Sequence, residues 1–600
     1  MTLTLEAKRS VDESVDPSSW KTLEPPAKYD PATKTVVIGG RRVRIGGPVP
    51  KLREGEKLVT YTASLCPHCY RLLPAVVFER EGKIWIRKVC PEHGEIEELY
   101  FGDARMYHRF VRYEDEGRGV RLPYVKLSAP CPFNCGLCPM HRNHSALINI
   151  VVTNRCNLKC WYCFFYAEKF GYVYEPSIEQ IRFMIRRAKA QGVTLAVQLT
   201  GGEPTLREDL VEIIKVLKEE GVRHVQLNTN GIRFAELYIE NPVKAVEYAR
   251  SLREAGLNTV YLSFDGVTPK TNWKNHWEVP FMFEVFRKAG VTSTVLVPTV
   301  IKGVNTHELG AIIKFAAKHL DVVRGVNFQP VSLTGLMPRH EREKYRVTIP
   351  DAIRYIEEQT DGQIHADAWY PVPVAAKFAE FVEAMTGEPQ FIMANHPACG
   401  AATYVFVERG EDGLPKRFIP ITDFFDVEGF IEYLEEKTVE LTKLRDSRLR
   451  KYLSLARLAI DLRKFVDQEK IPRNLNITKL LLKVFVKRNY EALGELHYKM
   501  LFLGMMHFMD LYNYDVARVA RCNIHYAVPD GRLIPFCTFN VLNDIYRDAI
   551  QKKYGVPLDQ WKGPLGLYKR PLLRLMRDPI YYEAYKGIVP DDVLKGKRPG

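Results

Sequence analysis

The distribution of cysteines is the feature that most constrains this chain of 600 residues. There are twelve cysteines, and most of them fall in short clusters. The clusters are Cys66, Cys69 and Cys90; Cys131, Cys135 and Cys138; and Cys156, Cys160 and Cys163; the dispersed cysteines are Cys399, Cys522 and Cys537. Thiolates so close along a chain suit soft metal ions and iron–sulfur clusters. A disulfide scaffold is disfavoured because the N-terminus has no apolar secretory signal.

Composition excludes several other classes of protein. With 46% hydrophobic and 26% charged residues, the chain is neither disordered nor collagen-like as a whole. The longest strongly apolar stretch, Met500–Met509, is about ten residues, shorter than the ~18–20 that span a bilayer. We therefore expect a cytoplasmic protein, with peripheral contact at the inner membrane face left open. The net charge of +14 would fit nucleic acid, anionic lipid headgroups or phosphorylated substrates.

The strongest signal is the segment LINIVVTNRCNLKCWYC, residues 147–163. An apolar run typical of a β-strand leads directly into Cys156, Cys160 and Cys163. Three thiolates can hold three irons of a 4Fe–4S cluster and leave the fourth iron open. With the aromatic Tyr162 before the last cysteine, this pattern resembles the radical S-adenosylmethionine (SAM) enzymes. The resemblance implies that SAM chelates the open iron and is cleaved reductively to a 5′-deoxyadenosyl radical.

The resemblance also implies which residues bind SAM. The apolar run Leu195–Thr200 is followed by a GGEP segment, which in this family holds the amino group of SAM. Two glycines let the backbone come close, and the glutamate supplies negative charge. Further polar contacts are expected at the carboxyl ends of parallel strands, with ordinary turn residues as the alternative. The candidates are Tyr162, Gly201, Gly202, Glu203, Pro204, Asn228, Ser263 and Asp265, with Asn230 and Gln329 also at strand ends.

Six apolar β-type runs alternate with helical patterns between residues 147 and 335, which predicts an α/β fold with a partial (β/α)6 barrel. The domains expected around it are a polar tail and hairpin at 1–57, a rubredoxin- or zinc-ribbon-like metal module at 58–128, an auxiliary 4Fe–4S segment at 129–146, and a C-terminal helical lobe with an auxiliary cluster site at 336–600. The hairpin is expected at Val36–Gly46, where strands of period two flank Gly39 and Gly40.

Three further metal sites are expected outside the barrel. Cys66, Cys69, Cys90 and His93 could bind one tetrahedral zinc or mononuclear iron ion, and His68 is a weaker candidate. Cys131, Cys135 and Cys138 predict a second 4Fe–4S cluster, whose fourth ligand could be His141, His144, a distant cysteine or substrate. Cys522 and Cys537, with Cys399 as third ligand, resemble the twitch or SPASM auxiliary sites that follow radical SAM barrels.

The C-terminal half has apolar and aromatic residues at helical spacing in Tyr452–Val466, Ile477–Asn489 and His497–Tyr512. Periodicity predicts amphipathic helices there. The simplest interpretation is a helical lobe that packs its own core. The alternative is an apolar channel with a cationic rim, in which Met500, Met505, Met506 and Met509 would accommodate a long apolar ligand.

The order of these cysteine motifs, from Thr60 to Phe539, resembles the archaeal tetraether lipid synthases. That resemblance implies C–C coupling between terminal carbons of phytanyl chains on archaeal diether phospholipids, with ferredoxin or flavodoxin as reductant. Members of this group have also been interpreted as methyltransferases of a pterin cofactor, which is the alternative, together with mid-chain lipid cross-linking. No RNA-binding module is visible, so no specific nucleic-acid partner is expected.

Overall fold

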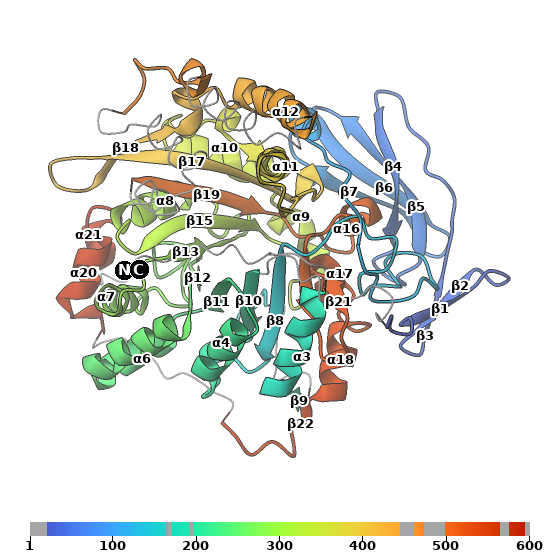
Figure 1. The fold of residues 1–600 in the computed structure, drawn as a ribbon, viewed down its shortest axis with the longest axis horizontal. Coiled ribbons are helices and arrows are strands. Elements are labelled where there is room, and N and C mark those ends of the chain that lie inside the picture. Colours follow the sequence, from blue (N-terminus) through green and yellow to red (C-terminus); the bar gives the residue numbers. More distant parts are fainter. Residues whose placement is uncertain are drawn as a thin grey trace.

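The computed structural model describes residues 21–163, 165, 171–190, 196–443, 461–472, 499–564 and 575–594 (Figure 1). A small antiparallel sheet comes first, formed by β1 (Ala27–Asp30), β2 (Thr35–Ile38) and β3 (Arg41–Arg44). Ile38 pairs with Arg41 across Gly39 and Gly40, whose φ angles are 55° and 78°. Two successive positive φ angles suit a tight hairpin turn, which glycine adopts at little cost. The expected hairpin is therefore confirmed.

The N-terminal ribbon is a four-stranded antiparallel sheet in the order β4-β5-β6-β7. Its strands are β4 (Lys57–Leu65), β5 (Leu72–Arg80), β6 (Lys83–Cys90) and β7 (Gly94–Phe101), and α1 (Ala104–Val111) follows. The Asp103 side chain caps α1 by accepting a hydrogen bond from the Met106 N–H. The ribbon places Cys66 at one strand end and Cys90 at another, so that the turns between strands bring their thiols together.

The six predicted strands of the barrel lie side by side in parallel, in the order β15-β13-β12-β11-β10-β8. They are β8 (Leu147–Thr153), β10 (Ala196–Gly201), β11 (His224–Thr229), β12 (Thr259–Ser263), β13 (Thr294–Val297) and β15 (Val323–Pro330). The connecting helices are α3 (Ile178–Lys189), α4 (Leu210–Glu219), α5 (Ile232–Glu240), α6 (Pro242–Ala255), α7 (Val279–Ala289) and α8 (Leu309–Lys318). Helices α3, α4 and α6 lie along the outer side of the strands (Figure 1). The α/β fold with its N-terminal ribbon is confirmed.

The C-terminal part extends this sheet at both edges. Strand β19 (Met500–Met506) pairs in parallel with β15, and β17 (Gly400–Arg409) pairs antiparallel with β19. At the other edge, β20 (Ile524–Ala527) pairs with β8, and β21 (Leu533–Pro535) pairs with β20. The prediction of a helix over residues 497–512 is therefore wrong. The run MLFLGMM is apolar at every position, so it satisfies a helical pattern and equally suits a strand buried on both faces.

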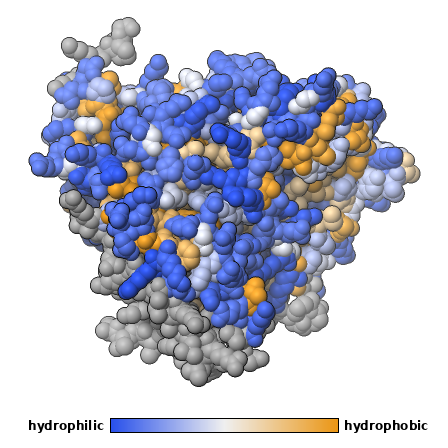
Figure 2. Space-filling view, turned by 90° about the horizontal axis from the view of Figure 1, so that it is seen from above, coloured by the Kyte–Doolittle hydropathy of each residue, from blue (hydrophilic) through white to orange (hydrophobic). Residues whose placement is uncertain are grey.

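The other C-terminal elements surround these strands. They include α10 (Ile349–Gln359), α11 (Val374–Thr386), α12 (Val427–Lys443), β18 (Pro415–Pro420), α16 (Val516–Ala520), α17 (Phe536–Val541), α18 (Arg547–Tyr554) and α20 (Pro579–Tyr585). The helix expected at 477–489, and residues 452–460 of the other, lie outside the described residues. Within the described residues no helix has both the length and the apolar character needed to cross a bilayer. The face in Figure 2 is mostly hydrophilic, with separate hydrophobic areas.

A buried ion pair attaches the ribbon to the loop after β19. Arg346 donates to Asp510 Oδ2 at 2.6 Å, and its Nε lies 3.3 Å from Glu98 of β7. The Lys88 ammonium, which is also buried, donates to the carbonyl oxygens of Leu511 and Tyr512 at 2.8 and 2.9 Å. The loop that follows β19 is thus fixed between the ribbon and the barrel.

Replacing Asp510 with asparagine is expected to destabilise the fold by about 3 kcal/mol, because it removes one of the two carboxylates that pair with the buried Arg346 and leaves only Glu98. Burial opposes ionisation of Asp510, but Arg346 prevails and lowers its pKa to about 2. The carboxylate therefore stabilises the fold above its unfolded pKa of ~4, and this contribution is lost as pH falls toward 2. Urea unfolding at several pH values measures both effects. Asp367→Asn, whose side chain is 90% exposed in its pair with Arg109, is the control and should change stability by at most ~1 kcal/mol.

Candidate active site

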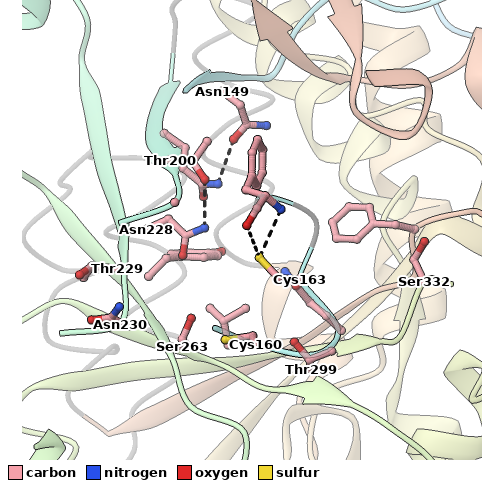
Figure 3. A pocket seen from close by; sticks show the side chains of 18 of the residues that line it. Asn149, Cys160, Cys163, Thr200, Asn228, Thr229, Asn230, Ser263, Thr299 and Ser332 are labelled. Atoms are coloured by element: carbon pink, nitrogen blue, oxygen red, sulfur yellow. Dashed lines mark hydrogen bonds between the residues drawn. The ribbon is translucent and has the colours of Figure 1, made fainter. Parts of the chain in front are cut away.

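A cavity of about 230 Å³ opens at the carboxyl ends of the parallel strands (Figure 3). Its lining includes many of the predicted residues: Cys156, Cys160, Tyr162, Cys163, Gly201, Gly202, Glu203, Asn228, Asn230, Ser263 and Gln329. Pro204 and Asp265 are not on this lining. In Figure 3, Cys160 and Cys163 lie on the same side of the cavity as Ser263 and Thr299, and Asn149 and Thr200 lie across from them. The cavity thus brings the cysteine loop and the strand ends together.

The cysteine loop begins where β8 ends. Cys163 Sγ lies 3.2 Å from the Phe165 N–H, and the Leu158 N–H donates to Cys156 Sγ at 3.4 Å. Burial raises the pKa of the Cys156 and Cys163 thiols. Such thiols ionise when they ligate a metal. Three soft donors around one open space fit a cluster that leaves one metal position for another ligand.

Gly201 and Gly202 pack against the start of this loop. A Cβ at Gly201 would lie 2.0 Å from Thr153 O, and one at Gly202 would lie 2.0 Å from Arg155 O. The Gly202 and Glu203 N–H groups donate to those same two carbonyls at 2.8 and 2.7 Å. The glycines therefore hold the cysteine loop against β10, a role that the sequence interpretation, which assigned them to SAM, did not include.

Replacing Gly202 with alanine is expected to reduce iron incorporation at the cysteine triplet strongly. The new methyl group would meet backbone atoms, which cannot move aside without displacing residues 154–156, at a cost of about 3 kcal/mol. Gly290→Ala is the control. An alanine at its φ of +74° would be strained by about 1–2 kcal/mol, but no atom lies within 4 Å of the added Cβ. Iron and sulfide analysis after anaerobic reconstitution compares the two. Normal iron content in Gly202→Ala would contradict this role.

The carboxylate of Glu203 is buried and already has several donors. It accepts hydrogen bonds from the Thr205 N–H at 3.0 Å, from the Thr229 hydroxyl at 2.6 Å and from the Asn230 N–H at 2.8 Å. Burial nevertheless raises its pKa above the ordinary value. The side chain is thus held rigidly at the cavity wall, where a further donor with a positive charge would stabilise the carboxylate. Contact with the SAM ammonium remains a prediction for this residue.

Asp265 lies behind the cavity wall in a network with Tyr162 and Lys274. The Tyr162 hydroxyl donates to Asp265 Oδ2, Lys274 Nζ lies 2.8 Å from the same oxygen, and the Thr299 N–H donates to Oδ1 at 2.9 Å. Burial opposes the charge of Lys274, but Asp265 and Cys160 raise its pKa. Asp265 therefore positions Tyr162 and Lys274. Of the two residues predicted at the end of β12 to contact SAM, only Ser263 lines the cavity.

Several lining residues were missed by the sequence interpretation. Lys274 lies in the polar loop after β12, where no spacing rule singles it out. Asn149 is a polar residue inside the otherwise apolar run of β8, and this is a signal that could have identified it, whereas Asn327 lies in β15, which also carries Arg324 and Gln329. Both are buried, and their amide nitrogens have no hydrogen-bond partner. The cavity therefore contains donors that a polar ligand could satisfy.

The C-terminal part supplies an apolar wall to the same cavity, formed by Met506, Phe508, Ile524, Tyr526 and Phe536. The rings of Phe508 and Phe536 stack with centroids 4.0 Å apart. These residues adjoin the third set of cysteines in the chain: Cys522 precedes Ile524 by two positions, and Cys537 follows Phe536. The Met509 N–H points at Cys537 Sγ at 3.5 Å, and the His507 N–H donates to Cys399 O at 2.9 Å. This set therefore lies beside the cavity.

The remaining triplet, Cys131, Cys135 and Cys138, lies next to that C-terminal set. Cys135 Sγ is 3.6 Å from the hydroxyl of Thr538, and His141 Nε2 is 2.7 Å from Cys522 O. His141 borders the small space enclosed by this triplet, whereas His144 packs on Phe391 and does not border it. Of the two predicted histidines, His141 is therefore better placed as fourth ligand. Neighbouring metal sites would suit electron transfer between them.

The ribbon site has the dimensions of a single tetrahedral ion. The ligand atoms of Cys66, Cys69, Cys90 and His93 all lie within 4.8 Å of one another. Cys69 Sγ is 3.9 Å from Cys90 Sγ, and His93 Nδ1 is 3.5 and 3.4 Å from the sulfurs of Cys66 and Cys90. Metal–sulfur bonds of ~2.3 Å in a tetrahedron would place sulfur atoms about 3.8 Å apart. The donor set fits zinc or iron, and His68 is outside it, stacked on His93.

Comparison with known proteins agrees with this geometry. Residues 150–316 match the Radical SAM superfamily, and residues 58–102 match the HMPTM N-terminal zinc ribbon domain. A protein of Methanocaldococcus jannaschii named 7,8-dihydro-6-hydroxymethylpterin dimethyltransferase is 46% identical over 509 residues, 84% of this chain and 96% of that protein.

More distant similarities cover smaller shares of the chain. A probable GTP 3′,8-cyclase of Methanothermobacter marburgensis is 30% identical over 231 residues, 37% of this chain and 69% of that protein. The solved structure of native anSMEcpe with bound AdoMet and the Cp18Cys peptide is 18% identical, with a TM-score of 0.25, over 41% of this chain and 62% of that one. The chain is a radical SAM enzyme and belongs to the family of the M. jannaschii protein.

Proposed function

We propose that this enzyme transfers methyl groups to a reduced pterin related to 7,8-dihydro-6-hydroxymethylpterin. The observation that carries the proposal is the 46% identity to the M. jannaschii dimethyltransferase across 96% of that protein. The cavity supports it, because the unpartnered amide nitrogens of Asn149 and Asn327 could donate to the ring nitrogens and carbonyl oxygen of a pterin. This substrate is the alternative that the sequence left open.

In the proposed reaction the protein positions reactants and excludes water. A 4Fe–4S cluster on Cys156, Cys160 and Cys163 would supply the electron that cleaves SAM reductively. Glu203 and Asn230, held by the hydrogen bonds described above, would orient SAM at the strand ends. Lys274 presents a buried positive charge to the cavity, and the stacked rings of Phe508 and Phe536 close its apolar side. A dry wall of this kind protects a reactive carbon centre from solvent.

Coupling of apolar lipid chains is the second candidate, and the apolar wall favours it. Met506, Phe508, Ile524 and Phe536 offer a surface for an alkyl chain next to the proposed SAM site. In that reaction the terminal carbons of phytanyl chains on archaeal diether phospholipids would be joined, as in the tetraether lipid synthases. Peripheral membrane contact and a lipid partner belong to this candidate.

The fate of the SAM methyl group distinguishes the two candidates. The reconstituted enzyme would be incubated anaerobically with a low-potential reductant, methyl-labelled SAM and either the dihydropterin or an archaeal diether phospholipid. Label in a pterin product would establish methyl transfer. A coupled lipid without label, formed with about two deoxyadenosines per new bond, would instead overturn the pterin proposal and establish lipid coupling.

A further inference from the structure

Arg518 of helix α16 is a buried cation with no carboxylate partner. Its side chain is 1% exposed, and its Nη2 donates to the carbonyl oxygens of Ala398 at 3.3 Å and His507 at 2.9 Å. Its Nε and Nη1 have no hydrogen-bond partner, and it forms no ion pair with the acidic residues that the structure describes. A buried guanidinium without a counter-ion is strongly unfavourable, so an anion is expected beside it.

The carboxylate that caps helix α16, that of Asp515, is hydrogen-bonded to groups other than Arg518. Asp515 accepts hydrogen bonds from the Thr62 hydroxyl at 2.6 Å, the Tyr100 hydroxyl at 2.7 Å and the Ala517 N–H at 2.9 Å. The Tyr100 ring lies under the guanidinium, with its centroid 5.4 Å from the Arg518 Cζ atom. A cation–π contact of this kind stabilises the charge but does not neutralise it.

The groups around Arg518 belong to the C-terminal cysteine site. Its two carbonyl acceptors are Ala398, which precedes Cys399, and His507, whose N–H donates to Cys399 O. Burial opposes the charge of Arg518, but the Cys399 thiol, together with Tyr100 and Cys537, raises its pKa. His507 is a second incomplete group here, because it is buried and both of its ring nitrogens lack partners. Arg518 and His507 are therefore two buried groups with unsatisfied nitrogens, and each is hydrogen-bonded to the backbone at Ala398 or Cys399.

We propose that Arg518 is the counter-cation of an anionic iron–sulfur cluster held by Cys399, Cys522 and Cys537, and that its charge sets the reduction potential of this cluster. Reduction adds one electron, supplied by a low-potential donor, and makes the cluster more negative. A fixed positive charge stabilises that reduced form more than the oxidised one. Removing the charge therefore makes the cluster harder to reduce. The proposal holds for either candidate substrate.

The test is a redox titration of the reconstituted full-length enzyme, followed by electron paramagnetic resonance. The signal that disappears in Cys522→Ala identifies the cluster at this site. In Arg518→Gln we expect the reduction equilibrium constant of that cluster to fall at least tenfold, which is 59 mV for a one-electron couple. Arg518→Lys keeps the charge and is expected to titrate much closer to the unchanged enzyme. Arg87→Gln, a buried arginine that has the carboxylates of Glu56 and Glu97 as partners, is the control and should leave this midpoint unchanged.

An unchanged midpoint in Arg518→Gln with full iron content would overturn the proposal. If Arg518→Gln loads no iron at this site, Arg518→Lys decides. A lysine variant that loads iron and titrates near the unchanged enzyme supports a counter-cation, because only the charge is common to both side chains. Equal loss of iron in both variants would show that the shape of Arg518 matters and its charge does not, and the proposal would fail.

Discussion

Alanine at Cys156, Cys160 or Cys163 is expected to abolish formation of 5′-deoxyadenosine from SAM. Each thiol lines the cavity at the carboxyl ends of the strands, and loss of one donor leaves too few ligands for a cluster with a single open position. We expect a fall in rate of more than a thousandfold, to background, measured by anaerobic turnover with reductant and chromatography of the nucleoside.

Cys69→Ala is the matched control for this prediction. It removes one ligand from the ribbon, whose four donors form a separate group. Cleavage of SAM should continue in that variant, at a rate reduced only by any loss of stability. Retained cleavage in a variant lacking Cys156, Cys160 and Cys163 together would show that the catalytic cluster is elsewhere.

Replacing Cys522 or Cys537 with alanine is expected to separate SAM cleavage from product formation. Both residues adjoin the apolar wall of the cavity, through Ile524 and Phe536. Neither belongs to the loop that carries Cys156, Cys160 and Cys163. Deoxyadenosine should still form, within about tenfold of the original rate, while alkylated or coupled product falls at least a hundredfold.

The ratio of product to deoxyadenosine is the quantity to measure in these variants. If both fall in proportion, the C-terminal cysteines serve only the fold. Ala527→Gly, a change on the same strand as Ile524 that leaves every cysteine in place, controls for local destabilisation. Its ratio should equal that of the unchanged enzyme.

The barrel could be predicted from sequence because its strands are short apolar runs separated by helices with clear periodicity. The same signal failed for β19, where Met500–Met506 is apolar at every position and period cannot distinguish helix from strand. Its pairing with β15 is a contact between segments about 175 residues apart, which local pattern does not encode. The sequence therefore predicts a C-terminal helical lobe with a cluster site, although strands β17, β19, β20 and β21 of this part extend the sheet at both edges.

Site residues were predictable where spacing implies chemistry, as in the cysteine clusters and the GGEP segment. Their individual contacts were not, because these depend on neighbours distant in sequence. Asp265 lies at a strand end like Ser263, yet its carboxylate is already paired with Lys274 and accepts a hydrogen bond from Tyr162. Gly202 lies in the family motif, yet its small size is required by the carbonyl of Arg155.

The site at Cys156, Cys160 and Cys163 is proposed to generate a radical that removes hydrogen from substrate carbon. The most direct measurement is mass spectrometry of the nucleoside formed from SAM in turnover with deuterated dihydropterin and, separately, deuterated diether lipid. With the true substrate, we predict 5′-deoxyadenosine that carries deuterium. S-adenosylhomocysteine as the sole nucleoside product, with no deoxyadenosine, would mean polar methyl transfer and would contradict the account.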